Sequence, residues 1–154
     1  MNKIYDDPAL IIHIESFLFQ SKSCLDVFAQ IIAYTFKFEI SSYQDFGNGL
    51  IKILEKKSFN DTKNSKLIID KIKENIPLIK ELVTMRDEVT HYSDLEGLSC
   101  FFIKQSKEND VFVRVYYPAM PNGERVSKYM DQIWNGINKL LYESLPILVD
   151  TAKK

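Results

Sequence analysis

The chain has 154 residues, enough for one folded domain and short for two. Hydrophobic residues make up 45% and charged residues 27%, a composition typical of folded globular proteins that excludes a disordered chain. Lys and Arg total 20 against 21 Asp and Glu, so the formal net charge is -1. The field of the whole molecule therefore does not draw it to nucleic acid or acidic lipid, and any polyanion must be held by a local cluster.

Cysteine usage and the N-terminal segment predict a cytoplasmic protein. Cys24 and Cys100 lie far apart, and only His13 and His91 could join them, which excludes a disulfide framework and argues against a structural zinc site. The N-terminal residues are acidic where a signal peptide is basic. The apolar stretch 10–38 is interrupted by charged side chains, so we predict buried helix there and no membrane partner.

The first half of the chain predicts helices. Asp7 followed by Pro8 is typical of a helix start, and apolar residues then recur at three- and four-residue spacing. The polar segment 21–23 predicts a break. A second helix to about Phe38 is then expected, either antiparallel to the first or continuing it with a kink. Residues 43–54 predict a third, weaker helix.

The second half predicts two long helices separated by a β-hairpin. Residues 58–65 read as a polar loop, and 67–89 carry a long helical pattern that Pro77 should kink or restart. Strand-forming residues then predict a hairpin over 98–117, with its turn near 107–110. A final amphipathic helix begins at Val126 and contains Pro146 near its end.

Together these elements predict a mainly α fold. We expect one domain, 1–154, that forms a bundle of four to five helices with the β-hairpin inserted before the last helix. Because isolated hairpins are marginal in water, the insert should pack on the bundle or on a second subunit.

Residues able to do chemistry concentrate at the end of the long predicted helix. Arg86, Asp87 and His91 lie there within six positions. Arginine is a permanent cation whose planar donor fork suits phosphate oxygens, and histidine exchanges a proton near neutral pH. Arg86 and His91 are therefore a plausible pair for cleaving a phosphodiester.

The sequence Arg86-Asp87-x-x-x-His91 resembles the Arg-x4-6-His motif of HEPN domains, the higher eukaryote and prokaryote nucleotide-binding domains. In that family the position of Asp87 is often Asn. The resemblance implies an α-helical, usually dimeric bundle, and many members are metal-independent endoribonucleases of toxin–antitoxin, abortive-infection and CRISPR systems. It implies RNA as substrate, a homodimer, a possible antitoxin or operon partner protein, and no metal or other cofactor.

The resemblance assigns catalysis to Arg86 and His91. His91 would act as general base or acid while the ribose 2′-hydroxyl attacks phosphorus, and Arg86 would stabilise the developing charge. On a straight helix these two positions are about 140° apart, whereas Asp87 and His91 share a face, so Asp87 is expected to orient His91. Arg86 would then converge through a distorted helix end or across a two-fold axis.

Several other interpretations stay open. The segment that begins at Arg86 also fits a solvated helix turn with a local ion pair. Glu88 and His91 match the Glu-x-x-His motif of a di-iron bundle, but such a site needs two copies of the motif and the sequence has one. His13 is predicted to be an interior or boundary residue. Trp134 and Tyr142 are expected in the core or at a subunit interface.

The predicted hairpin adds some positive charge. Lys104 and Arg114 are candidate RNA-binding residues there, although Glu108 and Asp110 dilute them. A second hypothesis therefore belongs to another class: a HEPN-like or unrelated helical module that acts without catalysis, through dimerisation or protein contact.

Overall fold

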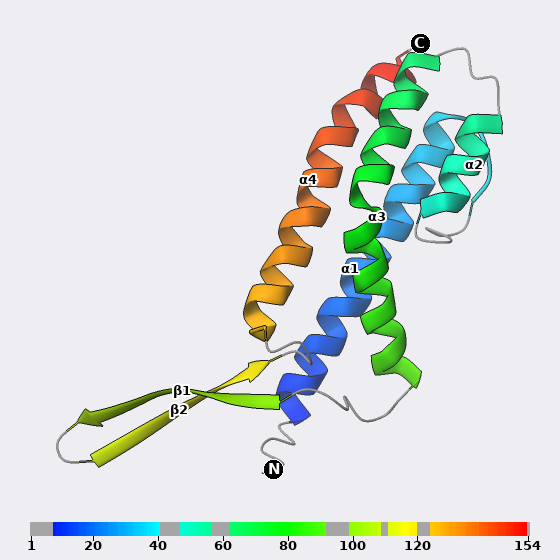
Figure 1. Ribbon diagram of the computed structural model, residues 1–154. Coiled ribbons are helices and arrows are strands. Elements are labelled where there is room, and N and C mark those ends of the chain that lie inside the picture. The colour runs from blue at the N-terminus through cyan, green and yellow to red at the C-terminus, as the bar shows by residue number, and fades with distance from the viewer. Residues whose placement is uncertain are drawn as a thin grey trace.

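The computed structural model describes residues 8–40, 47–56, 62–91, 99–108, 111–119 and 124–153. The fold is mainly helical, as the sequence predicts. Its helices are α1 (Pro8–Thr35), α2 (Asn48–Lys56), α3 (Thr62–His91) and α4 (Val126–Ala152), and its strands are β1 (Ser99–Glu108) and β2 (Val111–Ala119). The two strands follow α3 and precede α4 (Figure 1).

The first long element is one helix, and the predicted break at residues 21–23 is wrong. α1 runs without interruption through this polar segment. Ser21 is buried and Lys22 pairs with Asp26 one turn later, so the polar side chains are accommodated within the helix. Short polar residues weaken a helix only slightly, and burial of its apolar stripe outweighs that cost.

The helix α3 is also longer than the sequence pattern predicts. It begins at Thr62, inside the predicted loop, and continues through Pro77 to His91. At its start Asn64 is buried, and its Nδ2 donates hydrogen bonds to Asp150 Oδ2 (3.2 Å) and Thr151 Oγ1 (2.9 Å). This link to the last turns of α4 helps to extend α3 beyond its apolar repeat.

The core lies where α1, α3 and α4 pack together, with α2 against α3 (Figure 1). α1 and α4 run in the same direction, and α3 runs opposite to both. Fully buried side chains come from every one of these helices, among them Leu18, Phe28, Leu50, Ile72, Leu82, Tyr129 and Ile133.

The contact between α3 and α4 is unusually close at one point. Gly136 lies against Leu78, and a Cβ at Gly136 would stand 2.6 Å from Leu78 Cδ2. A second contact is the ion pair of Lys71 Nζ with Glu143 Oε2 at 2.7 Å. The two helices are therefore held in register by a steric fit and by a charge pair.

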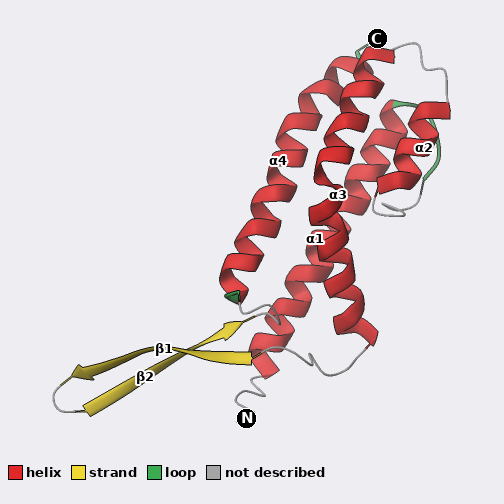
Figure 2. Cartoon of the chain, viewed as in Figure 1, coloured by secondary structure: helices red, strands yellow, loops and turns green. Residues whose placement is uncertain are grey.

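The strands form a two-stranded antiparallel sheet. Ser99 pairs with Ala119 and Glu108 with Val111, with an irregularity between Phe102 and Lys104. The sheet projects from the end of the bundle where α1 begins and α3 ends (Figures 1 and 2). Ala119, at its base, is fully buried.

Gly136→Val should destabilise the fold by about 1–3 kcal/mol, because the larger side chain overpacks the contact with Leu78. Adding Leu78→Ala should recover part of this loss, since the two residues touch. Urea unfolding of the single and double variants measures both effects. Asn135→Val on the exposed side of α4 is the matched control, and an equal loss there would contradict the assigned close contact.

The Lys71–Glu143 pair makes a testable contribution to the pH dependence of stability. The hydrogen bond from Lys71 lowers the pKa of Glu143 from its ordinary 4.5, and the hydrogen bond to Glu143 raises the pKa of Lys71. A lowered carboxyl pKa stabilises the fold above the ordinary value, and this contribution is lost as pH falls through the lowered pKa.

Glu143→Gln should therefore cost stability at pH 7 and cost progressively less below about pH 4. Urea unfolding across this range checks it, with Glu81→Gln, an exposed carboxylate of α3, as the charge-matched control. A stability difference that stays constant from pH 7 to pH 3 would show that the pair does not act as described.

Candidate functional site

Arg86 continues the buried stripe of α3 beyond its last core residue. Ile68, Ile72, Ile79 and Leu82 form this stripe and are fully buried, and Arg86 follows Leu82 by four positions, on the same side of the helix. Its side chain is only 28% exposed. An arginine therefore stands where the helical repeat calls for a hydrophobic residue, at the end of the bundle.

The guanidinium of Arg86 is paired with the carboxylate of Asp87. Nη2 of Arg86 donates to Oδ1 of Asp87, whose side chain is 47% exposed. The structure thus brings together two of the three residues of the predicted site. A phosphate that binds Arg86 would therefore compete with this carboxylate.

His91 is the last residue of α3. It lies on the same helix as Arg86 and five residues after it, which separates the two backbone positions by about 140° around the helix axis. The side chain of His91 lies outside the described part of the chain. Its convergence with Arg86, and its orientation by Asp87, remain predictions.

The two candidate RNA-binding residues of the hairpin occupy neighbouring register positions. Lys104 pairs with Val115, and Arg114 pairs with Gln105, the next position along. Their side chains lie outside the described part of the chain. The hairpin starts at the end of the bundle that carries Arg86 (Figure 1), so the fold brings the predicted motif and the base of the hairpin to one end.

The rest of the described chain offers little catalytic chemistry. His13 is exposed, so its predicted interior position is wrong: it lies on the side of α1 opposite the core. Burial raises the pKa of the Cys24 thiol, which disfavours a nucleophilic thiolate. Among the described side chains no group of three His, Cys, Asp or Glu is placed to hold a metal ion.

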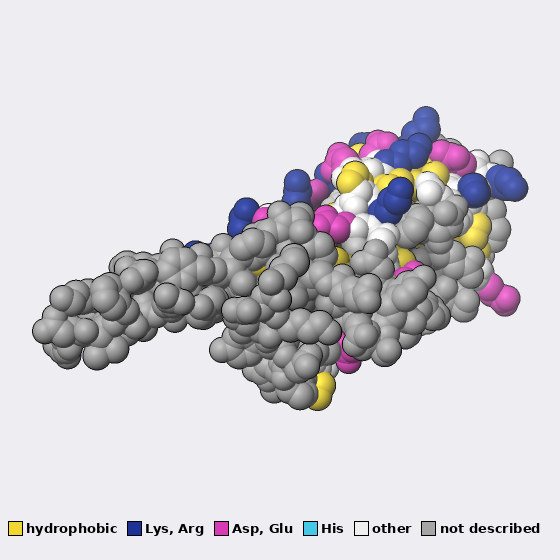
Figure 3. Space-filling view, turned by 60° about the horizontal axis from the view of Figure 1, so that its bottom comes forward, with side chains coloured by type: hydrophobic (Ala, Val, Ile, Leu, Met, Phe, Trp, Pro, Cys, Tyr) yellow, Lys and Arg dark blue, Asp and Glu magenta, His cyan; other side chains and the backbone are white. Residues whose placement is uncertain are grey.

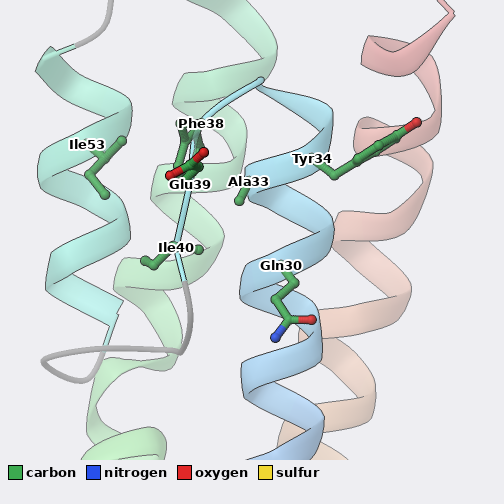
Figure 4. Close-up of a pocket in the computed structure, with 7 residues that line it drawn as sticks. All are labelled: Gln30, Ala33, Tyr34, Phe38, Glu39, Ile40 and Ile53. Carbon is green, nitrogen blue, oxygen red and sulfur yellow. The ribbon is translucent and has the colours of Figure 1, made fainter.

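An open groove of about 680 Å³ lies near the opposite end of the bundle, between the end of α1 and α2 (Figure 4). Phe38, Ile40 and Ile53 line it, and Glu39 supplies its charged group. Tyr34 is directed to the other side of α1 from Ile53. With a single carboxylate and mostly apolar walls, this groove has no pair of groups suited to acid–base catalysis.

Charge is distributed unevenly over the helices. The exposed residues of α3 are mostly charged, with Lys63, Lys66, Asp70, Lys73, Glu74, Lys80 and Glu81 among them. Within the described side chains of α1, in contrast, no exposed residue is Asp, Glu, Lys or Arg. Figure 3 shows basic and acidic side chains interspersed on the described surface of that view, so they form no single basic patch there.

Large hydrophobic side chains occupy the uncharged side of α1 and extend to α4. On α1 these exposed residues are Ile12, Phe19, Val27, Ile31 and Tyr34, and on α4 they are Trp134, Tyr142, Leu145 and Val149. We call this surface the α1–α4 face. The helical spacing predicts Trp134 and Tyr142 in the core or at an interface, and their exposed fractions of 56% and 78% exclude the core.

Sequence reasoning missed the α1–α4 face because α1 is apolar on several sides. The signal was present in the charges: Glu15, Lys22 and Asp26 all fall on one side of the helix, near the core edge. The opposite side consists of apolar, Ser, Gln and His residues.

Comparison with protein families, curated proteins and solved structures finds no match to this chain. Within the described residues, none of the helices is both long and apolar enough to cross a bilayer.

The position of Arg86 yields a test of whether it serves the fold. Arg86→Met should raise the free energy of unfolding by about 0.5–2 kcal/mol, because methionine extends the buried stripe while Asp87 keeps its access to water. Leu82→Ala, one turn earlier, should lower it by about 2–5 kcal/mol. Urea unfolding measures both. A clear loss of stability in Arg86→Met would identify a structural arginine instead.

Proposed function

We propose that the chain is a HEPN-like, metal-independent endoribonuclease of a toxin or defence system, acting as a homodimer in the cytoplasm. The observation that supports it is Arg86, a half-buried arginine on the core stripe of α3, five residues before His91. A charged residue that interrupts a hydrophobic repeat at the end of a bundle is more readily explained by a ligand than by stability.

The proposed reaction is transesterification of RNA. The 2′-oxygen bonds to the adjacent phosphorus, the bond from phosphorus to the 5′-oxygen breaks, and the products carry a 2′,3′-cyclic phosphate and a 5′-hydroxyl. His91 takes the proton from the 2′-hydroxyl or gives one to the leaving 5′-oxygen. Arg86 stabilises charge on the pentacovalent phosphorus, and Asp87 orients His91.

The hairpin is proposed to belong to the same domain and to extend the RNA-binding surface. Lys104 and Arg114 occupy successive register positions, which belong to opposite faces of the two-stranded sheet, so each would contribute to RNA binding separately. Contacts of such residues with phosphates would position the RNA and carry no sequence information. The domain proposed is the whole chain, 1–154, with four helices and the hairpin before the last.

A second candidate is a helical interaction module without catalysis. The Arg86–Asp87 ion pair favours it, since an arginine already bound to a carboxylate is less available to a phosphate. The α1–α4 face favours it as well, because exposed apolar surface of this size marks contact with another macromolecule.

Cleavage of mixed cellular RNA in the presence of EDTA tests the proposal. Wild type should cleave, and Arg86→Ala and His91→Ala should each reduce the rate by about 100-fold or more, the usual cost of losing a general acid–base or a charge-stabilising group. The product ends should carry a 2′,3′-cyclic phosphate.

Lys66→Ala is the control, because Lys66 is an exposed cation near the start of α3, at the other end of this helix from the proposed site. Its rate should equal that of wild type. Intact RNA with wild type, or equal cleavage by wild type and both site variants, would rule out the assigned catalysis and leave the interaction module.

A further inference from the structure

We infer that the α1–α4 face is a self-association surface, on which a second copy of this chain packs its own α1–α4 face around a two-fold axis. This inference names the interface of the homodimer in the proposed function and does not depend on the proposed catalysis. It rests on the described side chains of two long helices, and its observations are separate from the Arg86 site.

The first observation is that the exposed apolar side chains of both helices lie on one surface. α1 and α4 contact each other, and both contact α3. On α4, Gly136 packs against Leu78 of α3, and Trp134 lies two positions away, about 160° around the helix. Trp134 therefore lies on the side of α4 that faces away from α3, and the exposed apolar residues of α1 lie opposite the side that α1 buries in the core.

The second observation is the chemistry of this surface. It carries two aromatic residues from each helix, Phe19 and Tyr34 on α1 and Trp134 and Tyr142 on α4. Interface centres are enriched in aromatic residues and depleted of charge. α3, by contrast, presents charged residues to solvent, as expected for a helix that faces water.

The third observation selects a second copy over other partners. A two-fold interface packs the same surface against itself, so that surface must be complementary to itself. Among its described side chains α1 exposes no charge, and the exposed charges of α4 include both signs, Lys128 and Lys139 with Asp131 and Asp150, so the face carries no excess of one sign that would repel a second copy. A strongly basic or acidic partner is disfavoured because these charges form no patch of a single sign. A lipid surface is disfavoured because the described side chains of α1 include no exposed Lys or Arg beside the apolar residues, as an interfacial helix would have.

The fourth observation is size. Ile12 and Tyr34 are 22 residues apart, so the α1 part extends about 33 Å, and two adjacent helices are about 20 Å wide. Such a face is comparable with the roughly 800 Å² that each partner contributes to a standard stable interface. The area is therefore sufficient for a dimer without help from the hairpin.

Sedimentation equilibrium tests the inference on the full chain. Wild type at micromolar concentration should have twice the 17.9 kDa mass of the chain. Val27→Glu on α1 and Tyr142→Glu on α4 should each raise the dimer dissociation constant by at least about 100-fold, since each buries a charge at the interface. Both residues are exposed in the single chain, so circular dichroism should show unchanged helix content.

Lys80→Gln is the control, because it makes the same change in net charge on the exposed side of α3 and should remain dimeric. A wild-type protein that is still monomeric at about 100 µM would have at most a very weak interface, and this result would overturn the inference. So would a dimer that persists in both glutamate variants, which would place the interface elsewhere, for example on the hairpin.

Single cysteines locate the surface directly. In a Cys24→Ser, Cys100→Ser background, Ser16→Cys, Ser23→Cys and Gln30→Cys lie along the exposed side of α1, and Lys63→Cys lies on α3. Oxidative cross-linking of two chains should occur at one α1 position in preference to the others and not at Lys63→Cys. Equal cross-linking at all four positions, or none on α1, would contradict the assigned face. These readouts need no RNA, so they fail or succeed independently of the cleavage assay.

Discussion

The structure depends on the packing of α3 between α1 and α4. One hydrophobic stripe runs along α3 from Ile68 to Leu82 and supplies the centre of the core. Gly136 allows α4 to approach closely, and Lys71 with Glu143 holds the two helices in register. This arrangement fixes where the stripe ends, and Arg86 stands at that end. The same arrangement leaves the outer sides of α1 and α4 without a partner.

These two features lie on different parts of the molecule, so the proposed catalytic site and the proposed association surface are separate. Arg86, the end of α3 and the base of the hairpin gather at one end of the bundle. The α1–α4 face lies along the side of the bundle, away from α3. Self-association through this face would not bring the two copies of Arg86 together by itself. In that arrangement each proposed site is completed by residues of its own chain, and convergence of Arg86 with His91 depends on the geometry at the end of α3.

The sequence predicts the helical character well, because apolar spacing is a strong signal over long helices. The sequence is less informative where tertiary contacts determine where a helix begins, ends or continues. The break expected at residues 21–23 is absent because Ser21 is buried and Lys22 pairs with Asp26. The early start of α3 depends on Asn64 reaching Asp150 and Thr151, 86 and 87 positions away. Such contacts leave no local pattern.

The same distinction applies to the candidate site. Spacing identified Arg86, Asp87 and His91 as neighbours on one helix, but only the fold shows that Arg86 continues a buried stripe and pairs with Asp87. His13 was misplaced because flanking isoleucines suggested burial, whereas its side of α1 faces away from the core. The exposed aromatic residues of α4 required the fold as well, since helical spacing does not tell which side of a helix a neighbour covers.

RNA is proposed to bind at the end of the bundle that carries Arg86. Photocross-linking with RNA whose 2′-hydroxyls are replaced by hydrogen tests it most directly, because such RNA lacks the attacking group and stays intact on the protein. Mass spectrometry of the cross-linked peptides should place the contacts on the last turns of α3 and on the hairpin, and Arg86→Ala should reduce their yield. Cross-links confined to the α1–α4 face, or an equal yield with Arg86→Ala, would contradict the account.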